Sequence, residues 1–210
     1  MGFSADDLSL VEADVANPAS GARNTSPGGG GTDQQGAVLV LAGIGGPDAV
    51  RQFLAAIPDG FARPVVVRQR LDGGRHDRLV QQMQRATTLP VALAEAGTRL
   101  QAGRIYILPD GMTTQPQGDD SVFSATDAPV PVLAGLPAGD SAILLLSGSD
   151  PDAVPEAMAA AAQGAIVAGQ AVEDCFDSAA TAALVAAGGE ASAPADFAQR
   201  LSTRWLSLSL

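Results

Sequence analysis

Short apolar runs alternate with amphipathic stretches from Ala37 onward, and this alternation limits the possible folds more than any other feature of the chain. Strand followed by helix, repeated, is typical of βαβ units and a parallel sheet. Right-handed crossovers between such strands place helices on both faces of the sheet. We therefore predict a three-layer α/β/α fold with a doubly wound, mostly parallel, Rossmann-like sheet. The predicted strands are residues 37–43, 64–69, 90–96, 104–108, 142–148 and 164–169.

The predicted helices carry their apolar residues on one face. In the first of them, Val50, Phe53, Leu54 and Ile57 follow the i, i+3, i+4, i+7 spacing that buries one side of a helix. A Gly-Gly pair separates the last two helices. The predicted helices are residues 47–57, 76–86, 151–162, 177–188 and 194–208.

A single domain at residues 37–210 accounts for most of the chain, since 210 residues is near the usual size of one domain. Residues 1–36 end in a tract of Gly, Ser, Thr and Gln, and we interpret them as a flexible N-terminal linker or remnant. Residues 109–140 are rich in Pro, Gly and Asp and show little periodicity. We expect a loop there, with one edge strand through SVFSA.

Charge and hydropathy exclude several classes of function. The formal net charge of −11 disfavours non-specific binding to nucleic acid or to anionic lipid. The longest apolar runs, such as AVLVLAG and AILLL, are shorter than the ~18–20 residues that a membrane span needs. The acidic N-terminus lacks the basic and apolar regions of a secretion signal. We therefore expect a cytoplasmic protein that does not insert into membranes.

Metal-ligating residues are few, and the basic residues are unevenly placed. Cys175 is the only cysteine and His76 the only histidine, so neither an internal disulfide nor a metal site is expected. All twelve basic residues are arginines, and eight of them fall between positions 63 and 104. This part of the chain is basic although the protein as a whole is acidic.

In an open parallel sheet, ligands and catalytic groups gather outside the C-terminal ends of the strands. The loop after the first predicted strand, LAGIGGPDA, offers Gly43 and Gly45 as the start of a dinucleotide-binding G-x-G-x-x-G motif. Asp48 replaces the third glycine and puts a carboxylate where the pyrophosphate would bind. The loop also lacks the Lys and the Ser or Thr of a phosphate-transfer loop, so no cofactor is expected.

Three blocks of sequence occur in an order that resembles one family. They are VLVLAGIGGPDAVRQFLAAIPDGFARPVVVRQRL, then PVALAEAGTRLQAGRIYILPDG, then ILLLSGSDPDAV. Together they resemble the catalytic domain of the chemotaxis methylesterase CheB over about residues 37–200. In that family the first strand leads into a Ser-Thr-Gly-Gly loop, the second into Gln-His, and a G-M-G-x-D-G loop closes the site. The resemblance implies a carboxylic ester hydrolase fold, whose members remove methyl groups from glutamyl esters of chemoreceptors with a Ser-His-Asp triad.

The family's catalytic triad carries over at one position of three. Gly43 stands where the family has the serine nucleophile, and Ile44 stands where it has the threonine. Arg70 stands at the position of the histidine. Asp152 matches the family aspartate, and Ser149 replaces the methionine whose backbone helps to hold the oxyanion.

Ester cleavage needs a nucleophile and a base that accepts its proton near neutral pH. Glycine has no side chain, and a guanidinium with a pKa above ~12 cannot act as the base. The resemblance therefore implies a degenerate triad, and we expect the domain to act by binding rather than by catalysis. The residues expected to form the binding surface are Ile44, Gly45, Gly46, Arg75 and Ser149.

Three alternatives stay open at this stage. An active methylesterase or glutamine deamidase would need a relocated site, for which the candidates are His76, Ser147, Ser149 and Asp152. An ion pair between Arg70 and Asp152 would plug the former active site. A small-molecule sensor would use the emptied loop after the first strand as its pocket.

The expected partners are the cytoplasmic helices of a chemoreceptor, or another protein of a chemotaxis or type IV pilus (twitching motility) pathway. Receptor helices are rich in glutamate around their adaptation sites, which would complement the arginines between positions 63 and 104. Family members usually carry an N-terminal receiver domain, which residues 1–36 are too few to form. We therefore do not expect control by phosphorylation of this chain.

Overall fold

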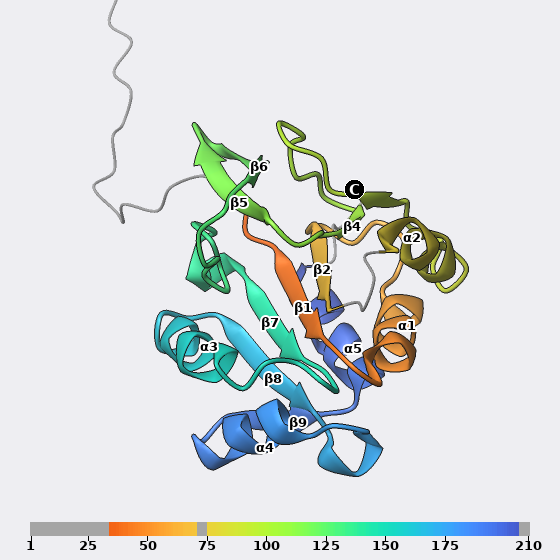
Figure 1. The fold of residues 1–210 in the computed structure, drawn as a ribbon, viewed down its shortest axis with the longest axis vertical. Helices are drawn as coiled ribbons and strands as arrows, with labels where there is room; N and C mark the ends of the chain where they lie inside the picture. Colours follow the sequence, from red (N-terminus) through yellow and green to blue (C-terminus); the bar gives the residue numbers. More distant parts are fainter. Residues whose placement is uncertain (1–33, 71–74, 206–210) are drawn as a thin grey trace, which may run out of the picture. The chain divides into compact units, whose positions relative to one another are not determined.

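The computed structural model describes residues 34–70 and 75–205 of the chain. Parallel strands form the main sheet in the order β3-β4-β2-β1-β7-β8-β9 (Figure 1). The predicted doubly wound sheet is confirmed, and each of the six predicted strands lies within a few residues of its expected bounds. The strands are β1 (Val38–Ala42), β2 (Val65–Gln69), β3 (Val91–Leu93), β4 (Ile105–Ile107), β7 (Ala142–Leu145), β8 (Ile166–Gln170) and β9 (Glu190–Ser192).

Helices lie on both faces of the sheet, as expected. On one face the rings of Phe53 and Phe197, from two neighbouring helices, have centroids 6.4 Å apart within a large apolar cluster. None of the described helices is long and apolar enough to cross a membrane. The helices on this first face are α1 (Gly46–Ala56), α2 (His76–Gln84) and α5 (Pro194–Trp205), and those on the opposite face are α3 (Ala153–Ala162) and α4 (Ala179–Ala186).

A β-hairpin covers the rest of the second face. β5 (Met112–Gln117) and β6 (Asp120–Ala125) pair antiparallel in a separate two-stranded sheet. Phe123 packs on Tyr106 of β4, with ring centroids 4.9 Å apart. The expected strand through SVFSA is confirmed as β6, although it pairs with β5 and not with the edge of the main sheet. β5 was not predicted, because this polar strand shows no apolar period. The short polar strand β9 was not predicted for the same reason.

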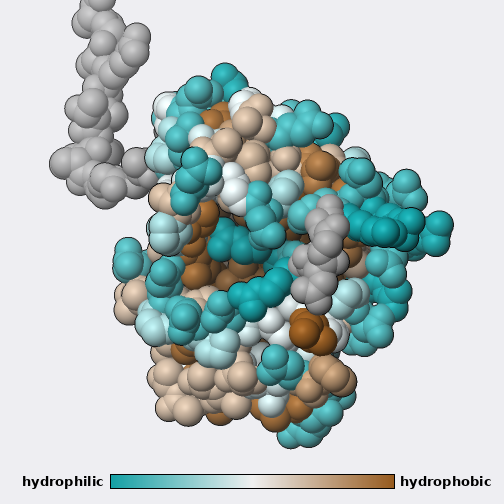
Figure 2. Space-filling model, in the orientation of Figure 1, coloured by the Kyte–Doolittle hydropathy of each residue, from teal (hydrophilic) through white to brown (hydrophobic). Residues whose placement is uncertain are grey.

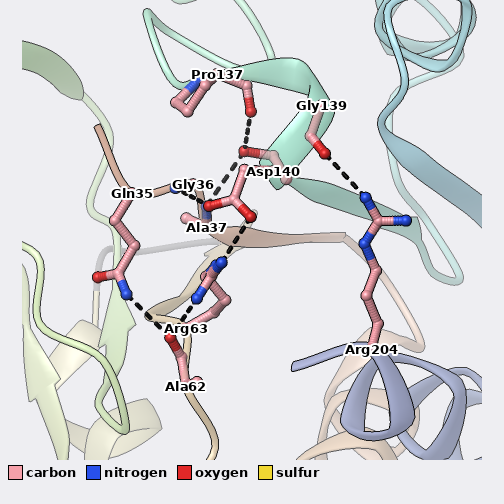
Figure 3. Close-up of polar contacts among 10 residues, drawn as sticks. Gln35, Gly36, Ala37, Ala62, Arg63, Pro137, Gly139, Asp140 and Arg204 are labelled. Atoms are coloured by element: carbon pink, nitrogen blue, oxygen red, sulfur yellow. Dashed lines mark hydrogen bonds and ion pairs between the residues drawn. The ribbon is translucent and has the colours of Figure 1, made fainter. Parts of the chain in front are cut away.

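Hydrogen bonds of Asp140 and Arg63 connect the segments at the end of the sheet where the strands begin (Figure 3). Arg63 precedes β2, and its Nη2 donates a hydrogen bond to Oδ1 of Asp140 at 2.6 Å. The Oδ2 atom of Asp140 accepts the backbone N–H of Gly36 at 2.8 Å, just ahead of β1. Nearby, Arg204 of α5 donates to the carbonyl of Gly139 at 3.0 Å. These contacts tie the starts of β1, β2 and β7 together and attach α5 to them.

Residues 34–36 belong to the predicted linker, but in the structure they form hydrogen bonds with the domain. The side-chain amide of Gln34 donates to the hydroxyl of Ser121 at 2.7 Å, and that of Gln35 donates to the carbonyl of Ala62 at 3.0 Å (Figure 3 shows the second contact). The remainder of the predicted linker, residues 1–33, lies outside the described residues.

Replacing the Asp140 carboxylate tests how far this end of the sheet depends on it. We expect Asp140→Ala to lower the free energy of unfolding by about 1–3 kcal/mol, because the N–H of Gly36 and the guanidinium of Arg63 lose a shared acceptor. Urea unfolding followed by circular dichroism measures the change. Asp127→Ala is the matched control, because the structure describes no hydrogen bond for this exposed carboxylate. Equal stability of the two variants would contradict the assignment.

Candidate functional site

A cavity of about 160 Å³ lies outside the C-terminal ends of β1, β2 and β7. The chain continues from β1 to β2 on one side, while β7 pairs with β1 on the other, so the strand order reverses at this point. Ligands of doubly wound sheets bind at such a switch point. Figure 2 shows the molecule hollowed near the centre of the view, with hydrophilic surface inside the hollow and a hydrophobic wall beside it. The cavity is lined by Leu41, Ala42, Arg68, Arg70, Asp110, Gly148, Ser149, Asp150 and Ala153.

The loops that follow β1 and β7 press their backbones together at the edge of this cavity. The N–H of Gly43 donates to the carbonyl of Ser147 at 3.0 Å. A Cβ atom added to Gly43 would lie 1.8 Å from the carbonyl oxygen of Gly148, well inside the contact distance of two atoms. A Cβ atom on Gly148 would in turn lie 2.2 Å from the nitrogen of Ile44. Position 43, which the resemblance matches to the family nucleophile, is therefore closed to a side chain in this backbone arrangement.

Two buried glutamines hold these loops from either side. Gln69, at the end of β2, donates from Nε2 to the carbonyl of Gly43 at 2.7 Å. Gln170, at the end of β8, accepts the N–H of Ser147 at 3.0 Å and donates to the carbonyl of Asp174 at 2.9 Å. Both side chains are more than nine-tenths buried. Their amides supply the loop backbones with partners that water would otherwise provide.

Arg70 forms an ion pair across the mouth of the cavity, with a partner other than the one considered from the sequence. Its Nη2 lies 2.8 Å from Oδ2 of Asp150, and the two side chains are 66% and 48% exposed. The backbone N–H of Asp152 donates to Oδ1 of Asp150, and this bond, together with that from Arg70, lowers the pKa of the Asp150 carboxyl. Asp152 itself is exposed at the N-terminus of α3. Asp150, which sequence reasoning passed over, is therefore the acidic residue that pairs with Arg70.

The serine hydroxyls near the cavity are used in structural hydrogen bonds. Ser147 Oγ donates to the carbonyl of Ile44 at 3.0 Å and accepts the N–H of Asp177 at 3.0 Å. Ser149 Oγ donates to the carbonyl of Leu146 at 2.6 Å. Both serines are about 95% buried or more. Both hydroxyl groups are therefore engaged by backbone groups of the surrounding loops.

The other residues expected to bind lie along the same edge of the molecule. Gly45 has a φ of 79°, a left-handed conformation that favours glycine, and Gly46 begins α1. Ile44 is 63% exposed and lines a second, shallower hollow with Gly45 and Phe176. Arg75 is the exposed residue that precedes α2. In the described residues there is no group of three His, Cys, Asp or Glu side chains placed to hold a metal ion.

Arg68 and Asp110 were not singled out from the sequence, yet both line the cavity. Arg68 is half-buried on β2, and burial lowers the pKa of its guanidinium while Asp110 and Glu156 act to raise it. The signal in the sequence is the interruption of the apolar run PVVV by a charge one residue before the strand ends. Asp110 gave no such signal, because it lies in the irregular segment ahead of the hairpin.

Fold and site together define a doubly wound α/β domain that places its chemistry or its ligand at the strand ends. A sequence model described as CheB methylesterase matches residues 38–201. The chain belongs to the CheB methylesterase family, which confirms the resemblance drawn from the three sequence blocks. The matches to individual relatives cover less than half of the chain.

Curated relatives match over a limited length. The chain is 32% identical over 77 residues to a protein-glutamate methylesterase/protein-glutamine glutaminase of Methanospirillum hungatei, covering 37% of this chain and 22% of that protein. It is 34% identical over 95 residues to one from Myxococcus xanthus, covering 45% and 27%. The matches thus span about a quarter of the relatives' length. The Thermotoga maritima CheB methylesterase catalytic domain has the same fold, with a TM-score of 0.75 at 18% identity, over 81% of this chain and 99% of that one.

A serine placed at position 43 tests whether this position is closed to side chains. We expect Gly43→Ser to lower the free energy of unfolding by at least ~1–3 kcal/mol, because the new Cβ must displace the backbone of Gly148. Chemical unfolding of purified protein measures this. Gly139→Ser is the matched control, because a Cβ there meets its nearest atom, the carbonyl oxygen of Gln163, at 3.7 Å. A Gly43→Ser variant as stable as this control would show that the loop has room for a nucleophile.

Proposed function

We propose that this chain is a CheB-family domain without methylesterase activity, which acts as a binding or regulatory module in a chemotaxis or type IV pilus pathway. The main support for this proposal is the backbone contact at Gly43, where a Cβ would lie 1.8 Å from the carbonyl oxygen of Gly148. The absence of a nucleophile is therefore built into the packing of two loops and is not reversed by one side chain. Arg70, at the position that the resemblance matches to the histidine, adds a guanidinium, which offers donors but no acceptor for a proton.

The names of the relatives indicate the kind of partner that we propose. Those proteins are named for action on protein glutamate and glutamine, and we extend this to the cytoplasmic helices of a chemoreceptor. Arg70 lines the cavity, and Arg75 is the exposed residue that precedes α2. Such arginines favour approach by glutamate-rich helices even though the chain is acidic overall. A domain that acts by binding needs such exposed arginines but does not need a catalytic triad.

Loss of hydrolysis is tested directly. We expect no methanol release from a methylated chemoreceptor cytoplasmic fragment above the protein-free background, because neither position 43 nor position 70 supplies a nucleophile or a base. An active CheB methylesterase assayed in parallel shows that the substrate is competent. Release that disappeared in Ser147→Ala, Ser149→Ala or His76→Ala would establish the relocated site instead and would overturn the proposal.

Binding is tested with the same receptor fragment. We expect the affinity of the wild-type protein to fall as NaCl is raised, and the double variant Arg70→Glu, Arg75→Glu to bind at least tenfold more weakly. The matched control is Arg85→Glu with Arg104→Glu, which makes the same change of charge at the other ends of α2 and the sheet. Isothermal titration calorimetry gives the dissociation constants. Equal losses in both double variants would point to net charge alone and contradict a site at the cavity.

A further inference from the structure

Large apolar side chains are exposed on the loops that follow β1 and β8. Four such side chains are exposed in the described part of the chain, and three of them, Ile44, Val172 and Phe176, belong to these two loops. Phe176 is 81% exposed and Ile44 is 63% exposed. The loops lie against each other, since a Cβ atom added to Gly45 would be 2.6 Å from the Cβ of Phe176. Single exposed apolar residues are ordinary on a protein surface, whereas a group of them is typical of an interaction site.

Ile44 and Phe176 border a hollow of about 630 Å³, which shares no lining residue with the cavity at the ends of β1, β2 and β7. This hollow runs between the first turns of α1 and the loop after β8. On the α1 side it is lined by Asp48, whose carboxylate is engaged by Arg51. The hollow is therefore a separate feature of the surface, with its own chemistry.

Hydrogen bonds from buried side chains hold both loops in place. The hydroxyl of Ser147 donates to the carbonyl of Ile44 and accepts the N–H of Asp177, each at 3.0 Å. Gln170 donates to the carbonyl of Asp174 at 2.9 Å. The backbone on both sides of the exposed aromatic ring is therefore fixed. A partner that covers the ring does not have to order the loop first, which lowers the entropic cost of binding.

Carboxylates surround this apolar surface. Asp174 lines the hollow, and Glu173 and Asp177 are exposed beside it on the same loop. None of the three takes part in an ion pair within the described residues. Burial raises the pKa of the Cys175 thiol, and the charges of these three carboxylates raise it further. The loop thus combines an apolar centre with a negatively charged rim.

From this arrangement we infer that the hollow is a docking site for a partner protein segment that presents a large apolar side chain between lysine or arginine residues. The apolar side chain covers Phe176 and Ile44, and the basic side chains face the three carboxylates of the rim. An apolar centre with a polar rim is the usual anatomy of a protein interface, and opposite charges at the rim orient the partner and speed its association.

The charge of the rim also separates this partner from others. A glutamate-rich receptor helix is repelled by the same carboxylates, and so is an anionic membrane surface. The inference therefore goes beyond the proposed function, which relies on Arg70 and Arg75. The domain offers arginines to an acidic partner at one surface and carboxylates to a basic partner at another.

The test uses three short amphipathic peptides of equal length. The first places leucine on one face of a helix and lysine on the other, the second has glutamate at every lysine position, and the third has glutamine at every leucine position. We expect the leucine–lysine peptide to shift the backbone NMR signals of Gly45 and Phe176 and to bind at least tenfold more tightly than either of the others. Equal binding of the leucine–glutamate peptide, or no shift at these residues, would overturn the inference.

Variants of the exposed apolar residues identify the surface that binds. Phe176→Ser is expected to weaken binding of the leucine–lysine peptide at least tenfold, because it removes the most exposed large apolar side chain. Val185→Ser is the matched control, since Val185 is exposed on α4, outside the two loops. Urea unfolding of each variant shows that it is folded. Undiminished binding by folded Phe176→Ser would overturn the assignment.

Variants of the rim test the role of charge. Glu173→Gln with Asp174→Asn is expected to weaken binding of the leucine–lysine peptide at least threefold and to reduce its dependence on NaCl. The matched control is Asp119→Asn with Asp127→Asn, which removes two exposed carboxylates in the turn and the segment next to β6. Equal losses in the two double variants would show that net charge alone attracts the peptide and would contradict a site at this loop.

Sedimentation of the protein alone distinguishes a partner from a second copy of the chain. We expect the wild-type protein to sediment as a monomer. Self-association that disappears in Phe176→Ser would assign the surface to a second copy and overturn the inference. The receptor-fragment assay is independent of these results, because its outcome is judged by the variants of Arg70 and Arg75.

Discussion

The contact between the backbones of Gly43 and Gly148 is the constraint on which the rest of the site depends. It brings the loops after two neighbouring parallel strands so close that no Cβ fits between them. Gln69 and Gln170 then satisfy the carbonyl and N–H groups that this approach removes from water. Closely packed backbone thus forms part of the cavity's edge. The residues that line the cavity come from β1, from the end of β2, from the loop between β7 and α3, and from the segment ahead of the hairpin.

A consequence for chemistry follows from this geometry. An acyl-transfer enzyme places a side-chain oxygen at the strand end and surrounds it with groups that move its proton. Here the end of β1 leads into closely packed backbone, and the charged residues that line the cavity beside it are Arg68, Arg70, Asp110 and Asp150. Such a set of side chains is suited to the binding role that we propose for the domain.

The alternation of apolar runs was sufficient to predict the parallel sheet, its two layers of helices and the end of the sheet at which the cavity lies. The same pattern could not reveal the hairpin, because β5 is polar and its partner is found only in three dimensions. Within the site, the resemblance to the family selected Arg70 and Ser149, which line the cavity. It selected Asp152, but the turn that begins α3 puts Asp150 beside Arg70. Contacts between loops far apart in the sequence leave no trace in a local pattern.

The hairpin of β5 and β6 is structurally separate from the main sheet. It forms its own two-stranded sheet and is attached through the contact of Phe123 with Tyr106 and through backbone hydrogen bonds to residues 97–100. Its strand pairing is therefore separate from the hydrogen-bond ladder of the main sheet. Because the segment leading into the hairpin carries Asp110 to the cavity, a change in this segment can alter the charge at the cavity while the parallel sheet keeps its pairing.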